Sequence, residues 1–420
     1  MSGRILLLLV AGVTIVSGRS PQSDYIDDLV RTERYSQRFS NNVKEDAKLD
    51  VPELIKKYKY PLEVHEVTTP DGYILQMHRI PHGRVQNNVP GTKRPVVFLM
   101  HGLLCSSADW IISGPGSAFG YILAEEGFDV WMGNARGNYY SRNHVELNPD
   151  NTDFWDFSWD EIGHIDLPTM IDHALAETGN EKIHYVGHSQ GTTAFLVLCS
   201  LRPEYNDKII SMHAFSPVAF MAHNESPVLN AIAPFANSIK ILASLIGIGE
   251  IMPNSMLLTW AGQIFCKDSA ITQEICSNIL FAVGGWNDAH LNTTMMPVIF
   301  GHTPAGSSVK QFAHYGQSIA TKEFRRYNHG FVKNLRLYGR RSPPKYDLSN
   351  IVVPIFFYYS DNDPLSQSKD VYRLYEELGS ESKVLLPLPS FGHLDYLWGI
   401  DVKPLLYDTV VQLMEVLEDQ

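Results

Sequence analysis

A serine between two glycines, Gly187-His188-Ser189-Gln190-Gly191, has the residue types and spacing of an activated nucleophile. A β-branched and aromatic run over residues 183–186 precedes it, and an apolar run typical of a helix follows. Because glycine has no Cβ, the two glycines permit a strand and a helix to approach closely around a serine in a strained turn. Free N–H groups at the helix start favour negative charge beside that serine. The pattern is short, and an ordinary turn serine is the alternative interpretation.

A serine hydroxyl becomes a good nucleophile only when a base takes its proton and a carboxylate orients that base. Asp363 and His393 each come directly after a predicted strand. They would therefore lie with Ser189 beyond the carboxyl ends of the strands, where an open α/β sheet binds its ligands. Asp361 is the alternative acid, because it lies on the same loop. We predict Ser189 as nucleophile, His393 as base and Asp363 as acid, in the chain order Ser, Asp, His.

Acyl transfer by such a serine also needs N–H groups that stabilise the negative oxygen of the tetrahedral intermediate. We expect one to be the backbone N–H of Gln190, directly after the nucleophile. The second is expected from Leu103, on the loop that follows a predicted strand over residues 95–100. Arg136 lies in another glycine-rich loop. We interpret Arg136 as a buried structural anchor rather than as a substrate ligand.

Strands that alternate with helices must position these groups. Alternating runs over residues 62–68 and 73–79, on either side of Asp71-Gly72, predict an antiparallel hairpin. The pattern of a buried strand recurs at residues 95–100, 128–132, 183–186, 209–216, 351–359 and 384–388, and helices are expected at 159–178 and 404–417. These elements predict an α/β fold with a mostly parallel central sheet flanked by helices.

This alternation stops over residues 217–344, which we interpret as an inserted helical cap or lid. Residues 50–216 and 345–420 then form the two parts of the core. Within the insertion, residues 231–248 carry one charge, Lys240, and a stripe of apolar residues at helical spacing: Ile232, Phe235, Ile239, Leu242 and Leu245. Such a stripe is more often plain core than a lipid-facing lid.

The amino terminus predicts entry into the secretory pathway. Residues 1–18 combine a basic start, an apolar run and small residues, which is typical of a signal peptide. The run is too short to span a bilayer comfortably, so we expect no transmembrane segment in the mature chain. Residues 19–49 are polar and charge-rich, as in a mobile or processed leader. A secreted or lysosomal location would permit glycosylation at the sequons of Asn224 and Asn292.

Composition limits the partners and cofactors. The chain of 420 residues has a formal net charge of −12, which argues against nucleic acid and against an anionic membrane surface, but not against a neutral lipid interface. Cys266 and Cys276 enclose a loop of nine residues and are candidates for a disulfide, whereas Cys105 and Cys199 lie in core-like surroundings and are expected as free thiols. The sequence lacks metal-ligand spacing and a phosphate-binding loop, so we expect no metal and no cofactor.

Several motifs together resemble those of the acid lipase family, which contains gastric and lysosomal lipases. They cover the chain from about residue 60 to its end, and they include residues 69–75, 101–104, 133–138, 185–193, 304–308 and 393–395. The resemblance implies an α/β-hydrolase core with a cap and lid, and no protein cofactor.

The resemblance also implies roles for particular residues. It assigns a catalytic triad and two oxyanion donors to the positions already singled out: Ser189, Asp363 and His393, with Leu103 and Gln190. It further implies a disulfide bond in the cap between Cys266 and Cys276.

Three functions are compared on these grounds. The leading hypothesis is a serine ester hydrolase, most specifically an acid lipase that cleaves fatty acyl esters such as triacylglycerols or sterol esters at a lipid–water interface. A carboxylesterase for smaller soluble esters is the second, and the long cap speaks against it. A non-catalytic lipid-binding protein on the same fold is the third. Retention of the nucleophile, base and acid speaks against that reading.

Overall fold

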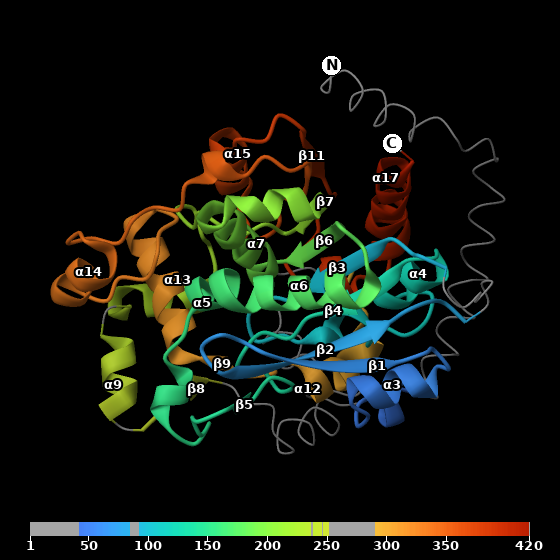
Figure 1. The fold of residues 1–420 in the computed structure, drawn as a ribbon, viewed down its shortest axis with the longest axis horizontal. Coiled ribbons are helices and arrows are strands. Elements are labelled where there is room, and N and C mark those ends of the chain that lie inside the picture. The colour runs from blue at the N-terminus through green and yellow to red at the C-terminus, as the bar shows by residue number, and fades with distance from the viewer. Residues whose placement is uncertain (1–41, 85–91, 237, 246, 252–289, 420) are drawn as a thin grey trace.

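The computed structural model describes residues 42–84, 92–236, 238–245, 247–251 and 290–419. In this part of the chain, nine strands form one central sheet, and six neighbouring strands run parallel (Figure 1). The sheet order is β1 (Glu63–Thr68), β2 (Tyr73–Ile80), β4 (Asp129–Met132), β3 (Val96–Met100), β6 (Ile183–His188), β7 (Ile209–Phe215), β10 (Ile355–Tyr359) and β11 (Lys383–Pro387). The short β5 (Asn143–His144) pairs with β2. The predicted α/β fold and its antiparallel hairpin, β1 with β2, are confirmed.

Alternate side chains of the parallel strands enter two different hydrophobic cores, one on each face of the sheet. In β3, Val96 and Phe98 join the first core, and Val97 and Leu99 join the second. The first core is covered by α6 (Leu167–Thr178), α7 (Gln190–Leu201) and α15 (Ser368–Glu377). The second is covered by α3 (Val51–Lys57), α4 (Phe119–Glu125), α16 (Asp395–Trp398) and α17 (Asp408–Glu418). Burial on both faces explains why these strands are continuous apolar runs.

Two helices and one strand differ most from the prediction. The helix expected over residues 159–178 is α5 (Trp159–Glu161) and α6, separated by a π-helical turn over residues 162–166. A second π-helical turn, over residues 403–407, begins the helix that continues as α17. Strand β10 starts at Ile355 rather than Ile351, directly after Pro354, which has no N–H to donate to a ladder.

The predicted cap contains five described helices: α8 (Pro227–Ile232), α9 (Ile239–Leu245), α12 (Met296–His302), α13 (Val309–Thr321) and α14 (Phe331–Tyr338). Two short strands, β8 (Glu250–Ile251) and β9 (Ser307–Ser308), pair with each other. Helices α9 and α14 project at one end of the molecule (Figure 1). The boundaries of the cap stay a prediction.

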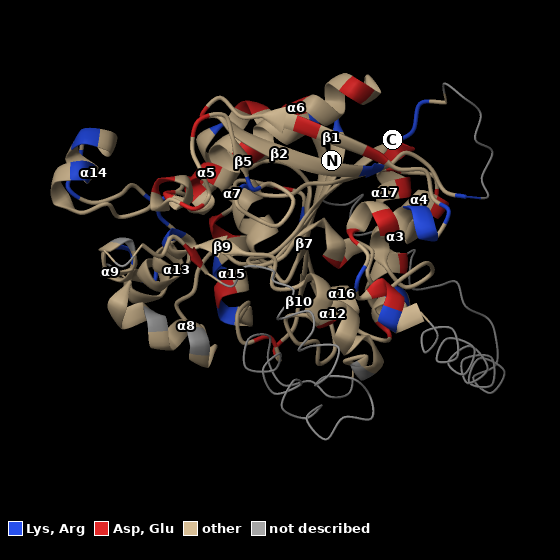
Figure 2. Ribbon diagram, turned by 90° about the horizontal axis from the view of Figure 1, so that it is seen from below, with Lys and Arg blue, Asp and Glu red and all other residues tan. Residues whose placement is uncertain are grey.

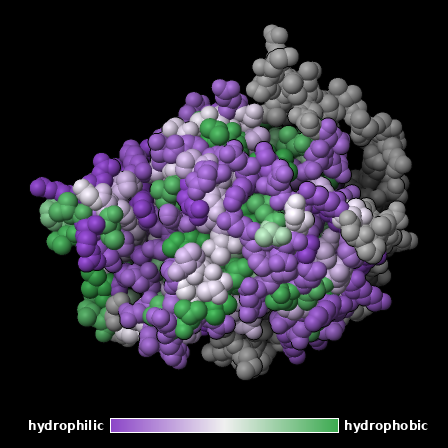
Figure 3. All heavy atoms as spheres, in the orientation of Figure 1, coloured by the Kyte–Doolittle hydropathy of each residue, from purple (hydrophilic) through white to green (hydrophobic). Residues whose placement is uncertain are grey.

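The apolar stripe over residues 231–248 is not plain core. The side chains of Phe235, Leu242 and Leu245 are 60%, 57% and 78% exposed. Figure 3 shows hydrophobic surface at the same end of the molecule, over α9 and α14. The common expectation that a helical apolar stripe is buried is therefore wrong for these three residues.

Candidate active site

Ser189 lies at the apex of a tight turn between β6 and α7. Its backbone has a φ of 52° and a ψ of −116°, which is strained for a residue with a side chain. A Cβ on Gly191 would approach the carbonyl oxygen of Met100 to 2.2 Å, and one on Gly187 would approach the carbonyl carbon of Gly191 to 2.7 Å. The two glycines therefore have the steric role inferred from the sequence, and the strained turn directs the serine out of the sheet.

His393 and Asp363 complete a chain of hydrogen bonds that starts at Ser189. The Ser189 hydroxyl lies 2.8 Å from Nε2 of His393. The Nδ1 atom of the same ring lies 3.0 and 3.1 Å from the two carboxylate oxygens of Asp363. All three side chains are buried. Asp363 follows β10 and His393 follows β11, so the parallel sheet brings together residues that are 174 and 30 positions apart in sequence. Such a chain can transfer a proton from the serine to the imidazole.

Asp363, rather than Asp361, contacts the histidine. The Oδ1 atom of Asp363 also accepts hydrogen bonds from the backbone N–H groups of Leu365 and Ser366, at 2.9 and 3.0 Å. Burial raises the pKa of Asp363, but the positive charge of His393 and the hydrogen bonds outweigh it, so this pKa lies below its usual value. Asp361 is exposed, and its carboxylate accepts a hydrogen bond from the hydroxyl of Ser368.

Ser216 is a site residue that the sequence reasoning missed. It follows β7, is fully buried and has a φ of 49°. Its hydroxyl donates to Asp363 at 2.5 Å and lies 2.7 Å from Nδ1 of His393. The Ser216 hydroxyl, at the end of β7, thus contacts both the Asp363 carboxylate after β10 and the His393 imidazole after β11. A signal was available: Ser216 is a polar residue at the carboxyl end of the strand predicted over residues 209–216, the next strand along the chain after that of Ser189.

His188, directly before the nucleophile, fixes the backbone of His393. Its Nε2 atom donates to the carbonyl oxygen of His393 at 2.8 Å. Burial, and to a lesser degree the neighbouring charge of His393, lower the pKa of His188 to about 3. His188 therefore stays neutral down to acid pH, and this hydrogen bond keeps the same form across that range.

The expected oxyanion donors lie beside the nucleophile. Gln190 is the first residue of α7, where backbone N–H groups have no partner within the helix. The loop that carries Leu103 is in contact with the nucleophile, because a Cβ on Gly102 would lie 3.3 Å from Cβ of Ser189. The roles of Gln190 and Leu103 as donors stay a prediction.

A polar contact joins the nucleophile turn to α13 of the predicted cap. The side-chain amide of Gln190 donates to Oε1 of Gln311, and the amide of Gln311 donates to the hydroxyl of Ser307 at 2.7 Å. Gln190 and Gln311 are both buried. Sequence reasoning gave Gln190 only a backbone role and gave Gln311 none.

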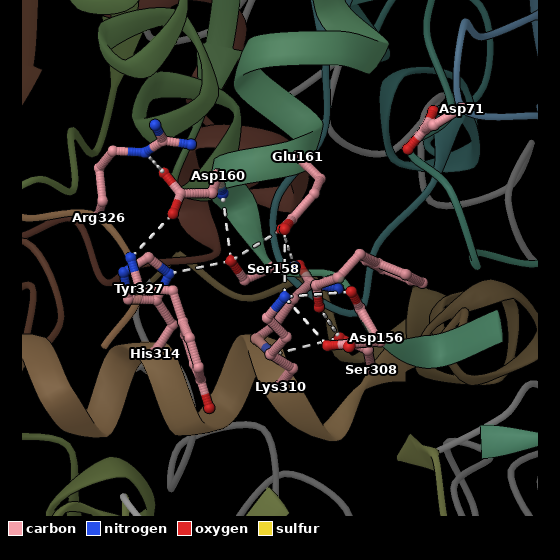
Figure 4. A network of polar contacts seen from close by, with 12 residues as sticks. Asp71, Asp156, Ser158, Asp160, Glu161, Ser308, Lys310, His314, Arg326 and Tyr327 are labelled. Atoms are coloured by element: carbon pink, nitrogen blue, oxygen red, sulfur yellow. Dashed lines mark hydrogen bonds and ion pairs between the residues drawn. The ribbon is translucent and has the colours of Figure 1, made fainter. Parts of the chain in front are cut away.

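This contact continues into a larger polar network between α13, the loop that follows it and residues 156–161, which we call the α13 seam. Figure 4 shows the part of the seam around Lys310 and Asp160 from close by. Nζ of Lys310 lies 3.1 Å from carboxylate oxygens of both Asp156 and Glu161. Asp160 accepts hydrogen bonds from the Arg326 side chain at 3.2 Å and from the Tyr327 backbone at 2.8 Å. Burial lowers the pKa of Lys310, but the two carboxylates raise it more, so the ammonium group stays charged. The seam fastens α13 to the core beside Ser189.

The structure also describes Arg136, two of the four cysteines and both asparagines of the predicted sequons. Arg136 is buried and forms ion pairs with Asp71 and Asp166, as expected of a structural anchor. Cys105 and Cys199 are buried free thiols, as expected. Cys266 and Cys276 lie outside the described residues, so their disulfide stays a prediction, as does glycosylation at the described Asn224 and Asn292.

Two kinds of feature are absent from the described ranges. Within them, no group of three or more His, Cys, Asp or Glu side chains is arranged to hold a metal ion. A search of the same residues also finds no helix with the length and apolar character needed to cross a membrane.

The fold and this site define the α/β-hydrolase class. Residues 95–400 match the family described as "alpha/beta hydrolase fold", and residues 51–114 match a "partial alpha/beta-hydrolase lipase region". Lipase 1 of Drosophila melanogaster is 45% identical over 89% of this chain and 81% of its own length. Gastric triacylglycerol lipase of Bos taurus and lysosomal acid lipase/cholesteryl ester hydrolase of Homo sapiens are each 38% identical over 88% of this chain, and over 92% and 91% of their own lengths.

The chain belongs to the acid lipase family. It is therefore a serine ester hydrolase of the lipase type, built on an α/β-hydrolase fold.

Proposed function

We propose that the protein hydrolyses long-chain fatty acyl esters, of triacylglycerols or sterols, at a lipid–water interface through Ser189, His393 and Asp363. The observation that carries the proposal is the buried hydrogen-bond chain from the Ser189 hydroxyl through the imidazole to the Asp363 carboxylate. The names of the gastric and lysosomal relatives support the substrate class.

In the proposed reaction, Oγ of Ser189 attacks the ester carbonyl carbon while Nε2 of His393 takes the hydroxyl proton. The backbone N–H groups of Gln190 and Leu103 stabilise the resulting oxyanion. The imidazolium then gives its proton to the departing alcohol, which leaves an acyl-enzyme. Water attacks that ester with His393 again as base, and the fatty acid is released. The low pKa of Asp363 keeps its carboxylate ionised at acid pH, so it stabilises the imidazolium there.

We further propose secretion or delivery to the lysosome. This rests on the signal-like residues 1–18 and on the family, whose members include a gastric and a lysosomal enzyme.

The test compares hydrolysis of emulsified long-chain triacylglycerol and of a soluble short-chain ester at pH 5 and pH 8. Wild type is expected to favour the emulsion at acid pH, and Ser189→Ala is expected to lose roughly 10⁴-fold or more in kcat on both substrates. Activity on the soluble ester alone would instead assign a carboxylesterase. An inactive wild type whose Ser189 resists a fluorophosphonate would assign a non-catalytic lipid-binding protein.

A further inference from the structure

Helix α14 presents apolar side chains to solvent instead of to the core. Phe331, Val332 and Leu335 are 53%, 78% and 50% exposed, and Leu337 is 50% exposed. The first three are at positions i, i+1 and i+4, so they share one face of the helix. Single exposed apolar residues are ordinary on a soluble protein, but a contiguous apolar face marks an interaction surface.

Polar contacts, rather than these apolar residues, hold α14 on the molecule. Asn334 is its buried residue. The Asn334 amide donates to the Asn328 side chain at 2.7 Å and to the backbone carbonyl of Arg341 at 3.0 Å. The hydroxyl of Tyr338 donates to the backbone carbonyl of Tyr327 at 3.0 Å. One side of the Phe331 ring faces the Arg341 guanidinium, 5.2 Å from the ring centroid, whereas Val332 and Leu335 are largely exposed and are available for another contact.

The segment around α14 reverses the charge of the whole chain. Residues 324–346 contain no Asp or Glu and seven basic residues: Arg325, Arg326, Lys333, Arg336, Arg340, Arg341 and Lys345. Figure 2 shows α14 at one end of the molecule with basic residues on it. In the described part of the chain, Lys333, Arg336, Arg340 and Arg341 form no ion pair. We call these four residues the α14 cations.

The α14 cations and the apolar face point to one kind of partner. We propose that α14 docks the protein on an anionic lipid surface, an inference that rests on the proposed function of a lipase working at an interface. Apolar side chains enter the headgroup and acyl boundary while the cations pair with anionic headgroups. A nucleic acid or an acidic protein surface would use the cations and leave the apolar face exposed. The whole-chain charge of −12 argues against an anionic lipid surface, but charges more than about 8 Å away are largely screened at physiological salt.

Helix α9 strengthens the choice of a lipid surface. It projects at the same end as α14 (Figures 1 and 2), and its Ile241, Leu242 and Leu245 are 63%, 57% and 78% exposed. An extended apolar layer is the partner able to contact both helices at once.

The experiment measures binding of the full-length protein to vesicles that it cannot hydrolyse. One vesicle is made of ether-linked phosphatidylcholine, and the other of ether-linked phosphatidylcholine and phosphatidylserine in equal parts. Wild type should prefer the second. Changing all four α14 cations to Gln should weaken that binding about 600-fold, because each basic residue at an anionic surface contributes about fivefold. The matched control changes four exposed lysines elsewhere to Gln, namely Lys48, Lys56, Lys182 and Lys369, and should lose little.

Two results would overturn the docking proposal: no preference of wild type for the anionic vesicle, or an equal loss in the control, which would make it an effect of net charge. A second variant, Val332→Ser with Leu335→Ser, should lower vesicle binding at high salt, where the cations are screened. Unchanged binding there would exclude an apolar contact and favour an acidic macromolecule. Hydrolysis of emulsified long-chain triacylglycerol, without anionic lipid, by the same preparations tests the proposed function separately. If the protein hydrolyses the ester but does not bind the anionic vesicle, only the docking proposal is rejected. If it binds the vesicle but does not hydrolyse the ester, only the proposed function is rejected.

Discussion

Helices α13 and α14 belong to the same predicted cap and are separated by nine residues, yet they are held in opposite ways. Ten residues of α13 are buried, and its polar side chains form the α13 seam with the core beside Ser189. Helix α14 buries Asn334 alone and exposes its apolar residues. One part of the predicted cap is thus fixed to the core beside Ser189, and another part exposes apolar side chains.

The largest expected effect comes from breaking the α13 seam at Asp160. This carboxylate is buried and accepts hydrogen bonds from Arg326, Tyr327 and Tyr346. We expect Asp160→Ala to lower the free energy of unfolding by about 3–5 kcal/mol, because it leaves buried donors and a cation without their partner. Urea unfolding measures the loss. The exposed Asp153→Ala is the control and should change stability by about 0.5 kcal/mol or less. An equally small change in Asp160→Ala would show that the seam does not fasten the cap.

The second prediction tests whether Gln311 of α13 positions Gln190 for catalysis or only stabilises the fold. Gln311→Leu removes the acceptor for the Gln190 side chain. The loss of a buried acceptor costs about 1–3 kcal/mol and should shift Gln190, whose backbone N–H is an expected oxyanion donor. We therefore expect kcat on a soluble ester to fall by about 10-fold. KM should change little. Gln311→Glu keeps an acceptor and should recover most of the rate. Gln317 lies on the same helix and forms hydrogen bonds with the backbone of Asn328, so Gln317→Leu should lower stability but not kcat. Equal kcat losses in both Leu variants would make Gln311 merely structural.

The third prediction concerns Asp109, which accepts a hydrogen bond from Thr303 of the predicted cap at 3.0 Å. Burial raises its pKa to about 7, against about 3.9 in an unfolded chain. The folded state therefore binds the proton more tightly, and the free energy of unfolding falls as pH rises between these values. Asp109→Asn keeps an acceptor without a charge, so the variant should gain stability relative to wild type at pH 8 compared with pH 4. Urea unfolding at both pH values is the measurement. The exposed Asp207→Asn should not show this change, and a parallel pH dependence in Asp109→Asn and wild type would exclude the mechanism.

The smallest effect is expected on α14. Val332→Ser with Leu335→Ser should change the free energy of unfolding by about 0.5 kcal/mol or less per residue, since both side chains are already exposed. Thermal unfolding checks this. A loss of several kcal/mol would mean that the apolar face of α14 packs on the protein in solution, and the contrast with α13 would disappear.

The sequence carried the local chemistry well. The two glycines around Ser189 and the order of serine, acid and histidine are local motifs, and the structure places the three predicted residues within hydrogen-bonding distance of one another. It failed where a contact joins distant segments. Ser216 looked like the end of a strand, and its place between Asp363 and His393 follows only from the pairing of β7 with β10.

Gly379 also shows the difference between what a local pattern indicates and what a contact with a distant segment requires. Gly379 follows α15 and has the place of a left-handed helix cap. Its φ is not positive, however, and a Cβ there would lie 2.0 Å from the carbonyl oxygen of Ser349. The residue is glycine because another segment passes close to it, which a local pattern does not reveal.

The sequence by itself determined the parallel sheet, the nucleophile turn and the residues that meet at its edge, because strand periodicity, glycine sterics and motif order are local properties. Only the tertiary structure decided which apolar helix faces are buried. The stripe of α9 and the face of α14 have the same periodicity as core helices, and burial depends on whether another element covers them. In α13 the core covers the helix. Among the described residues, the apolar side chains Leu242 and Leu245 of α9 and Val332 and Leu335 of α14 are between 50% and 78% exposed.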